Sequence, residues 1–234
     1  MKTAFITGGG RGLGSGFVEY FLEQGFLVIA GVRKLNNVKR HHANLKHIQL
    51  DVSSDASMKQ AFDATTELCD HLDYLINNAG VNKDSATNNN KKIVCDLRYL
   101  DRKYLLDMFS INTIAPLLME KTFLPLLSKS KQAFIVNISS CRSSIKDEFA
   151  NSNGNYGYRA SKAALNSMTF ASTLDLPKNI KTYAVHPGDV KTDMNPNGEN
   201  DPKKQTRKII EISKNWKDEF NGQFLRFNGM FYPV

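Results

Sequence analysis

A tyrosine and a lysine four positions apart are the residues with the clearest capacity for chemistry. In the run Tyr158-Arg159-Ala160-Ser161-Lys162, the spacing places Tyr158 and Lys162 on one face of a predicted helix. A free tyrosine hydroxyl has a pKa of about 10, so proton exchange near neutral pH requires help. We expect the Lys162 ammonium to lower the pKa of Tyr158 and to prepare it for acid–base catalysis. The same spacing also occurs on exposed helices, so the pair indicates a catalytic site only together with other motifs.

A glycine-rich segment follows the first apolar run. Thr7-Gly8-Gly9-Gly10-Arg11-Gly12-Leu13-Gly14 lies between a predicted strand and a predicted helix. Glycines let the backbone approach a pyrophosphate closely, and the start of a helix favours its negative charge. The spacing G-x-G-x-x-G is absent, and the pattern is instead T-G-x-x-x-G-x-G. The segment predicts a nucleotide site, with a plain loop as the alternative.

An asparagine lies within an otherwise apolar predicted helix. Asn112 precedes Pro116 by four positions, and proline has no N–H group to donate to the Asn112 carbonyl. That carbonyl needs another donor. We infer that a water held there links it to the Lys162 ammonium. The alternative is a proline kink that Asn112 merely tolerates.

The order of apolar and amphipathic segments indicates which elements position these residues. Their alternation predicts βαβ units and a parallel sheet. The predicted strands are residues 3–7, 26–32, 46–50, 72–77, 132–138, 180–185 and 229–233. The predicted helices are residues 14–24, 54–69, 102–127, 158–176 and 203–220, and the predicted loops are residues 82–92, 148–157 and 195–204. We expect one α/β domain over residues 1–234, with a doubly wound parallel sheet of Rossmann type and a substrate-covering loop and helical region at about 193–220.

Composition narrows the classes of protein. The 234 residues, 41% of them hydrophobic, are enough for one core. The net charge of +8 is dispersed and accompanies no nucleic-acid-binding motif, and no apolar run is long enough to span a membrane. Residues 1–7 lack the features of a secretory signal, and Cys69, Cys95 and Cys141 show no metal-like spacing. We expect a cytoplasmic protein with three free thiols, no metal site, no nucleic-acid partner and no membrane association.

The motifs, taken in order, resemble the short-chain dehydrogenase/reductase family. The glycine segment has the family's spacing, Asn77-Asn78-Ala79-Gly80 matches N-N-A-G, and residues 158–162 match Y-x-x-x-K. Residues 158–166, residues 187–194, and Asn221-Gly222 with Gly229 look most like the C-factor and Sniffer-type carbonyl reductases. The resemblance implies hydride transfer between a nicotinamide and a small carbonyl or alcohol substrate. It also implies a homodimer or homotetramer formed through the helices that carry Asn112 and Tyr158.

The resemblance also implies a catalytic set of Asn112, Ser140, Tyr158 and Lys162. In that set, Ser140 holds the substrate oxygen and Tyr158 donates its proton. Lys162 also binds the nicotinamide ribose, and Asn112 with a water molecule returns a proton to Tyr158. Ser143 stays a second candidate for the serine role, because the segment between Ser140 and Tyr158 looks longer than in many members of the family.

The expected cofactor residues come from six places in the chain. They are Gly8, Gly10, Arg11, Gly12, Leu13, Gly14, Arg33, Asp51, Val52, Asn78, Ala79, Gly80, Tyr158, Lys162, Pro187, Gly188, Val190 and Thr192. No acid occurs between Glu23 and Asp51, whereas Arg33 follows the second predicted strand. An acid there would bond a ribose 2′-hydroxyl, and an Arg fork suits a 2′-phosphate. We expect NADP(H), with NAD(H) as the alternative.

Two other functions share these motifs. A signalling or sensor protein could bind NADP(H) without turnover, because a fold does not fix a function. An NAD-dependent alcohol dehydrogenase could run the reaction oxidatively. The set of four catalytic residues argues against the sensor, and the missing acid before Asp51 argues against NAD.

Overall fold

Short apolar runs form a parallel sheet at the centre of the molecule. The computed structural model describes residues 1–38, 40–82, 97–147 and 154–234. Within these residues the strands are β1 (Thr3–Thr7), β2 (Leu27–Val32), β3 (Leu45–Gln49), β4 (Tyr74–Asn77), β5 (Ala133–Ile138), β6 (Ile180–His186) and β7 (Phe224–Arg226). Their order is β3-β2-β1-β4-β5-β6-β7, and all neighbouring pairs are parallel. The order reverses between β1 and β4, which is where sheets of this type bind ligands.

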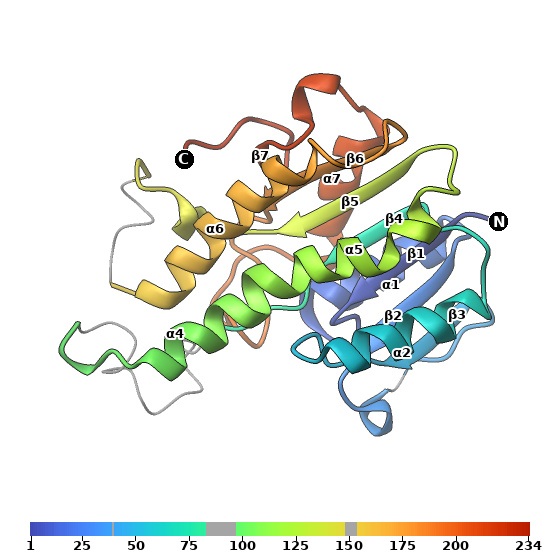
Figure 1. Ribbon diagram of the computed structural model, residues 1–234, viewed down its shortest axis with the longest axis horizontal. Coiled ribbons are helices and arrows are strands. Elements are labelled where there is room, and N and C mark those ends of the chain that lie inside the picture. Colours follow the sequence, from blue (N-terminus) through green and yellow to red (C-terminus); the bar gives the residue numbers. More distant parts are fainter. Residues whose placement is uncertain (39, 83–96, 148–153) are drawn as a thin grey trace.

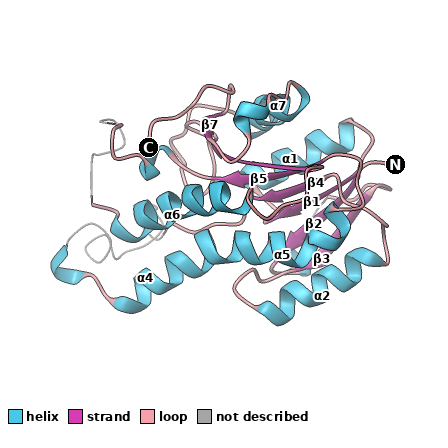
Figure 2. Cartoon of the chain, turned by 45° about the horizontal axis from the view of Figure 1, so that its top comes forward, coloured by secondary structure: helices cyan, strands magenta, loops and turns pink. Residues whose placement is uncertain are grey.

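Helices cover both faces of the sheet (Figures 1 and 2). On one face lie α1 (Gly12–Glu23) and α7 (Pro202–Lys214), and on the other lie α2 (Asp55–Thr66), α5 (Ala115–Leu127) and α6 (Tyr156–Ser172). Alternate strand residues serve the two cores: Ile6 packs with the α1 and α7 side, and Phe5 with the α2 and α5 side. Every residue of β1, β2, β4 and β5 is buried, as expected for a sheet covered on both faces.

The predicted helix at 102–127 contains a change of winding. It consists of α4 (Arg102–Phe109), a π-helical turn η3 (Ser110–Ile114) and α5, which together form the long helix in Figure 1. Such single-turn insertions are frequent at functional sites. The remaining elements of the described residues are the short 3₁₀ turns η1 (Leu35–Asn37), η2 (Leu97–Tyr99), η4 (Cys141–Ser143) and η6 (Asp218–Phe220).

The predicted α/β fold and parallel sheet are confirmed, and two predicted elements are wrong. The last strand is Phe224–Arg226 and not residues 229–233, because Phe224 and Leu225 are the buried pair beside β6. The chain then reverses at Gly229, which has a φ of +82°.

The charged helix at 203–220 is shorter than predicted and ends at Lys214. The Asn215 side chain donates to the Glu211 carbonyl, and the chain turns so that Trp216 packs on Phe134 and Phe220. Most residues of the predicted loops at 82–92 and 148–157 lie outside the described residues, and so does Cys95. Of the three cysteines, Cys69 and Cys141 are described, and both are free thiols. No helix in the described part of the chain is long and apolar enough to cross a membrane.

Candidate active site

The predicted catalytic residues meet where β5 ends against α6. Ser140 lies two residues beyond the end of β5, Tyr158 and Lys162 lie on α6, and Asn112 lies in η3. Lys162 is 5% exposed, and its Nζ donates to the carbonyl oxygen of Ile138 at 2.7 Å. The same Nζ lies 6.0 Å from the centroid of the Tyr158 ring. The ammonium therefore connects α6 to the end of the strand that carries Ser140.

The ionisation of Tyr158 differs from the sequence expectation. Burial raises the pKa of Tyr158, while a hydrogen bond with the Ser140 side chain and the charge of Arg142 lower it in part. The Lys162 ammonium, which donates to the Ile138 carbonyl, is not among the groups that cause this shift in pKa. Burial also lowers the pKa of Lys162 to about 8. At neutral pH the arrangement is therefore a protonated tyrosine beside a charged lysine.

The hydroxyl groups after β5 have separate partners. Ser140 bonds with Tyr158 and also accepts from the backbone N–H of Arg142. Ser143 is 7% exposed, and its Oγ donates to the Ser140 carbonyl at 2.7 Å and accepts from Nδ2 of Asn166 at 2.9 Å. The hydroxyl of Ser139 points to the Lys162 carbonyl. Ser140 is thus the hydroxyl of this group that contacts Tyr158.

Asn112 is fully buried and connects three elements. Its Oδ1 accepts from the Val81 backbone N–H at 2.9 Å, and its Nδ2 donates to the Val81 carbonyl at 2.9 Å and to Oγ of Ser161 at 3.1 Å. A Cβ placed on Gly80 would lie 3.2 Å from Oδ1 of Asn112 and 3.7 Å from Nζ of Lys162. The absence of a side chain at Gly80 therefore keeps space between Asn112 and Lys162. Sequence reasoning missed Ser161, although its position one turn after Tyr158 was a usable signal.

The glycine segment forms a tight turn against β4. A Cβ on Gly14 would lie 2.1 Å from the Gly8 carbonyl oxygen, so no other residue fits there. Gly8 and Gly12 have φ values of +68° and +53°, which glycine adopts without strain. The side chain of Arg11, the N-cap of α1, makes no capping hydrogen bond. The first N–H groups of α1 therefore receive no hydrogen bond from the N-cap side chain, and the start of a helix is a position that favours an anion.

Asn78 and Thr7 connect this turn to β4. The Nδ2 of Asn78 donates to the carbonyls of Thr7 at 2.9 Å and Gly8 at 3.3 Å. The Thr7 hydroxyl accepts from the backbone N–H groups of Asn78 and Ala79. Thr7 was not predicted as a site residue, although it is the first residue of the motif.

Arg33 and Asp51 lie at neighbouring strand ends, after β2 and β3. Two hydrogen bonds from Ser53 are the main cause of the lowered pKa of Asp51, and the charge of Arg33 adds to it. Ser54, and not Asp51, caps α2 by accepting from the Ser57 N–H. Arg33 and Asp51 therefore lie at the same edge of the sheet, beyond the carboxyl ends of β2 and β3.

Arg11 is paired with a residue that the sequence did not indicate. Its Nη1 lies 2.7 Å from Oδ2 of Asp193, and both side chains are largely exposed. The neighbouring Thr192 lies near the start of α1, since a Cβ on Gly12 would be 3.3 Å from its Cγ2. The segment after β6 therefore reaches across to the glycine turn.

Residues 189–200 fold as a hydrogen-bonded loop after Pro187 and Gly188. Asp189 accepts from Nδ2 of Asn195, and its carbonyl accepts from the N–H of Asn200. Val190 is buried and bridges to Asn200. Because α7 begins at Pro202, the predicted loop at 195–204 ends three residues early.

The chain is similar to proteins of one family along most of its length. A family model described as short chain dehydrogenase matches residues 2–203. The chain belongs to the short-chain dehydrogenase family. The NADPH-bound carbonyl reductase from chicken fatty liver is 30% identical, has a TM-score of 0.87, and covers 100% of this chain and 99% of its own. The carbonyl reductase Sniffer of D. melanogaster is 28% identical with a TM-score of 0.86, covering 100% of both chains. C-signal of Myxococcus xanthus is 31% identical over 173 residues, which are 73% of this chain and 97% of that protein.

In this short-chain dehydrogenase, a buried polar network lies behind the site. Nδ2 of Asn77 donates to Oδ1 of Asn137 at 2.8 Å, and Nδ2 of Asn137 donates to Oε1 of Glu120 at 2.9 Å and to Oγ1 of Thr169 at 3.0 Å. Burial raises the pKa of Glu120 to about 7. Because these residues come from β4, β5, α5 and α6, the network fixes those elements relative to one another. The pattern of apolar residues in the sequence does not indicate such a buried polar network.

His186, the last residue of β6, has a structural role. Burial lowers the pKa of His186 to about 4, so this residue of the dehydrogenase is neutral and packs edge-on against Tyr232. Among the described residues, no group of three or more His, Cys, Asp or Glu side chains could hold a metal ion.

Proposed function

We propose that this short-chain dehydrogenase is an NADP(H)-dependent carbonyl reductase. The observation that carries the proposal is the buried Lys162, whose Nζ donates to the Ile138 carbonyl at the end of β5 at 2.7 Å and lies 6.0 Å from the centroid of the Tyr158 ring. The likeness to the NADPH-bound reductase of chicken and to Sniffer supports the same reaction.

The residues present fit a nicotinamide nucleotide. The turn has no room for a side chain at Gly14, Gly8 and Gly12 have the positive φ that glycine favours, and the start of α1 suits a pyrophosphate. Leu13, Val52, Pro187, Val190 and Thr192 would line the same edge of the sheet, with Asn78, Ala79 and Gly80 between them. When bound, the cofactor supplies the hydride.

Tyr158 would protonate the carbonyl oxygen. Its raised pKa keeps the hydroxyl protonated at neutral pH, which suits donation in the reductive direction. Ser140, already in hydrogen-bond contact with Tyr158, would hold the same oxygen and stabilise its developing charge. Both hydroxyl groups would thus bind the carbonyl oxygen of the substrate.

Lys162 and Asn112 would support Tyr158. Lys162, with a pKa of about 8, stays mainly charged at neutral pH and would favour the tyrosinate that forms as the proton leaves. It would also bind the nicotinamide ribose. Asn112 would return a proton through water in the space that Gly80 leaves open.

Arg33 and Arg11 would select the 2′-phosphate of NADP(H). Arg33 lies beside Asp51 at the edge that would hold the adenosine end of the nucleotide, and its guanidinium can bind a phosphate with two donors. Arg11 would leave Asp193 and contribute a second cation to the same phosphate.

The assembly and location are further parts of the proposal. Leu106, Ile114, Leu117 and Phe170 are exposed apolar side chains on α4, η3, α5 and α6. We infer that they are covered in a homodimer or homotetramer. A cytoplasmic location would suit the free thiols of Cys69 and Cys141.

A screen of NADPH oxidation with ketones, aldehydes and quinones tests the proposal. Turnover of at least one class, with little oxidation of alcohols by NAD, is the expected result. Tight NADPH binding without turnover on any carbonyl would favour the sensor. Faster alcohol oxidation with NAD would favour the dehydrogenase alternative.

A further inference from the structure

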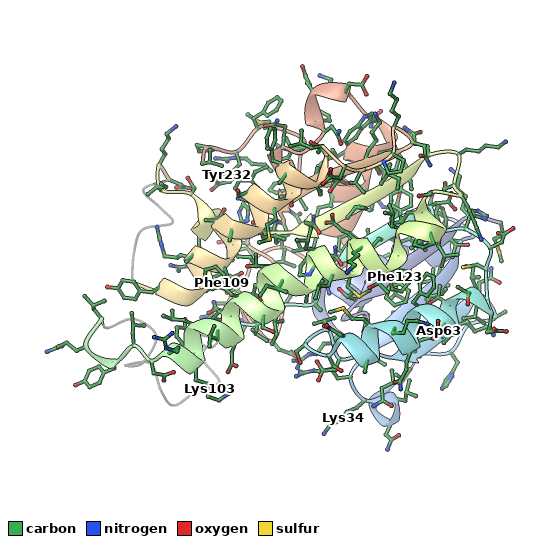
Figure 3. All side chains as sticks on the ribbon, viewed as in Figure 1. Lys34, Asp63, Lys103, Phe109, Phe123 and Tyr232 are labelled. Carbon is green, nitrogen blue, oxygen red and sulfur yellow. The ribbon has the colours of Figure 1, made fainter. Side chains whose placement is uncertain are left out.

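The segment after β7 returns to the edge of the sheet that carries the site. Gly229 reverses the chain, and the Arg226 N–H then donates to the Met230 carbonyl at 2.7 Å. The Tyr232 N–H donates to the Phe224 carbonyl at 2.9 Å. These backbone bonds fix Tyr232 next to β7. In Figure 3 it lies above α6, at the end of the molecule toward which β5 points.

The ring of Tyr232 is enclosed on several sides. It is 8% exposed, and its centroid lies 5.0 Å from that of Phe224 and 5.4 Å from that of His186. The Arg226 guanidinium lies 4.7 Å from the ring centroid. The packing around its ring therefore fixes the position of the Tyr232 side chain.

Tyr232 contacts both ends of the segment that follows Ser140, residues 141–147, which we name the Ser140 wall. Cys141, the first residue of the wall, packs on the cluster of Tyr232, Phe224 and Ala184. The Tyr232 hydroxyl donates to the carboxylate of Asp147, the last residue of the wall. The backbone N–H of Asp147 also donates to Oγ of Ser144.

The Ser140 wall lies against the reacting groups. Its Arg142 N–H donates to Oγ of Ser140, and the charge of Arg142 acts on the Tyr158 hydroxyl. A substrate whose oxygen lies between Ser140 and Tyr158 would therefore have the wall beside it. Movement of the wall would change how well that substrate is held, while the glycine turn and Arg33 lie on other strands.

We propose that Tyr232 is a positioning residue for substrate, which acts by fixing the Ser140 wall through Asp147. The proposal rests on the proposed carbonyl reductase function. Loss of a hydrogen bond to a carboxylate is large enough to raise KM for the carbonyl by about fivefold or more. The Kd of NADPH should stay within about twofold, because a bond remote from the cofactor contributes nothing to its binding.

The test compares Tyr232→Phe, Asp147→Ala, Asp147→Asn and the double variant Tyr232→Phe/Asp147→Ala. Tyr74→Phe is a matched control, because Tyr74 is also buried and its hydroxyl bonds with Oγ of Ser213 at 2.8 Å, away from the wall. We expect a raised KM in Tyr232→Phe and Asp147→Ala, no further rise in the double variant, and recovery in Asp147→Asn, which keeps an acceptor oxygen. An equal rise in Tyr74→Phe, or additive effects in the double variant, would overturn the proposal.

Hydrogen exchange of the Ser140 wall separates this proposal from the proposed function. Amides of residues 141–147 should exchange faster in Tyr232→Phe and Asp147→Ala than in the unmodified protein and in Tyr74→Phe. This readout needs no turnover, so an inactive unmodified protein would contradict only the reductase function. Unchanged exchange of the wall in Tyr232→Phe would overturn the positioning role.

Discussion

The Nζ atom of Lys162 donates a 2.7 Å hydrogen bond to the backbone carbonyl of Ile138. Ile138 is the last residue of β5, and Ser140 follows it closely, so the bond brings Ser140 to the helix that carries Tyr158. A buried ammonium with a partner of this kind costs less than an unpaired one. The same lysine thus joins the strand and the helix that supply the proposed proton donor and oxygen-binding hydroxyl.

Stability should fall as the pH rises through the titration of Glu120. Burial raises the pKa of Glu120 from 4.5 to about 7, so between these values the folded state holds a proton that the unfolded state has released. The free energy of unfolding should therefore decrease by about 3 kcal/mol between pH 4.5 and pH 8 from this group alone. Glu120→Gln keeps an acceptor for Asn137 and should remove this decrease. Urea unfolding at pH 5 and pH 8 measures it, and an unchanged pH dependence in Glu120→Gln would contradict the assignment.

Cofactor choice should depend on Arg33. We expect NADPH to bind more tightly than NADH by about 1.5 to 3 kcal/mol, the range of charge-assisted hydrogen bonds. Arg33→Asp should narrow or invert this difference, and Arg11→Ala should narrow it. Lys178→Asp makes the same change of net charge at an exposed residue before β6 and should leave the ratio of the two Kd values unaltered. Fluorescence titration gives both constants, and equal affinities in the unmodified protein would reject the role of Arg33.

The loop after Thr192 should behave as a substrate lid. Its contact with the glycine turn includes the exposed Arg11–Asp193 ion pair, and exposed pairs contribute at most about 1 kcal/mol. Amides of residues 193–201 should therefore exchange quickly without ligands and slowly with cofactor and substrate. Asp193→Asn should speed the exchange of the free protein further. Protection that ligands leave unchanged would indicate an ordinary surface loop.

Local patterns predicted the sheet and a catalytic set whose members lie close together in the structure, because the relevant information lies within short stretches. The glycine turn follows β1 directly, and Tyr158 and Lys162 share a helix face by their spacing alone. The pairs Arg11 with Asp193 and Tyr232 with Asp147 join residues far apart in the chain, and neither side chain indicates its partner. The raised pKa of Tyr158 was also missed, because burial depends on the packing of β5 against α6 and not on the spacing of Lys162.

The most direct test of the account is Tyr158→Phe, with NADPH oxidation and NADPH binding measured on the same preparation. The substitution removes one hydroxyl and leaves the ring, α6 and the glycine turn in place. Turnover of a carbonyl substrate should fall by at least about 100-fold, the scale of a positioned acid, while the Kd of NADPH stays within a few-fold. Lys162→Ala should impair both quantities. Turnover retained in Tyr158→Phe would contradict the central claim that Tyr158 donates the proton.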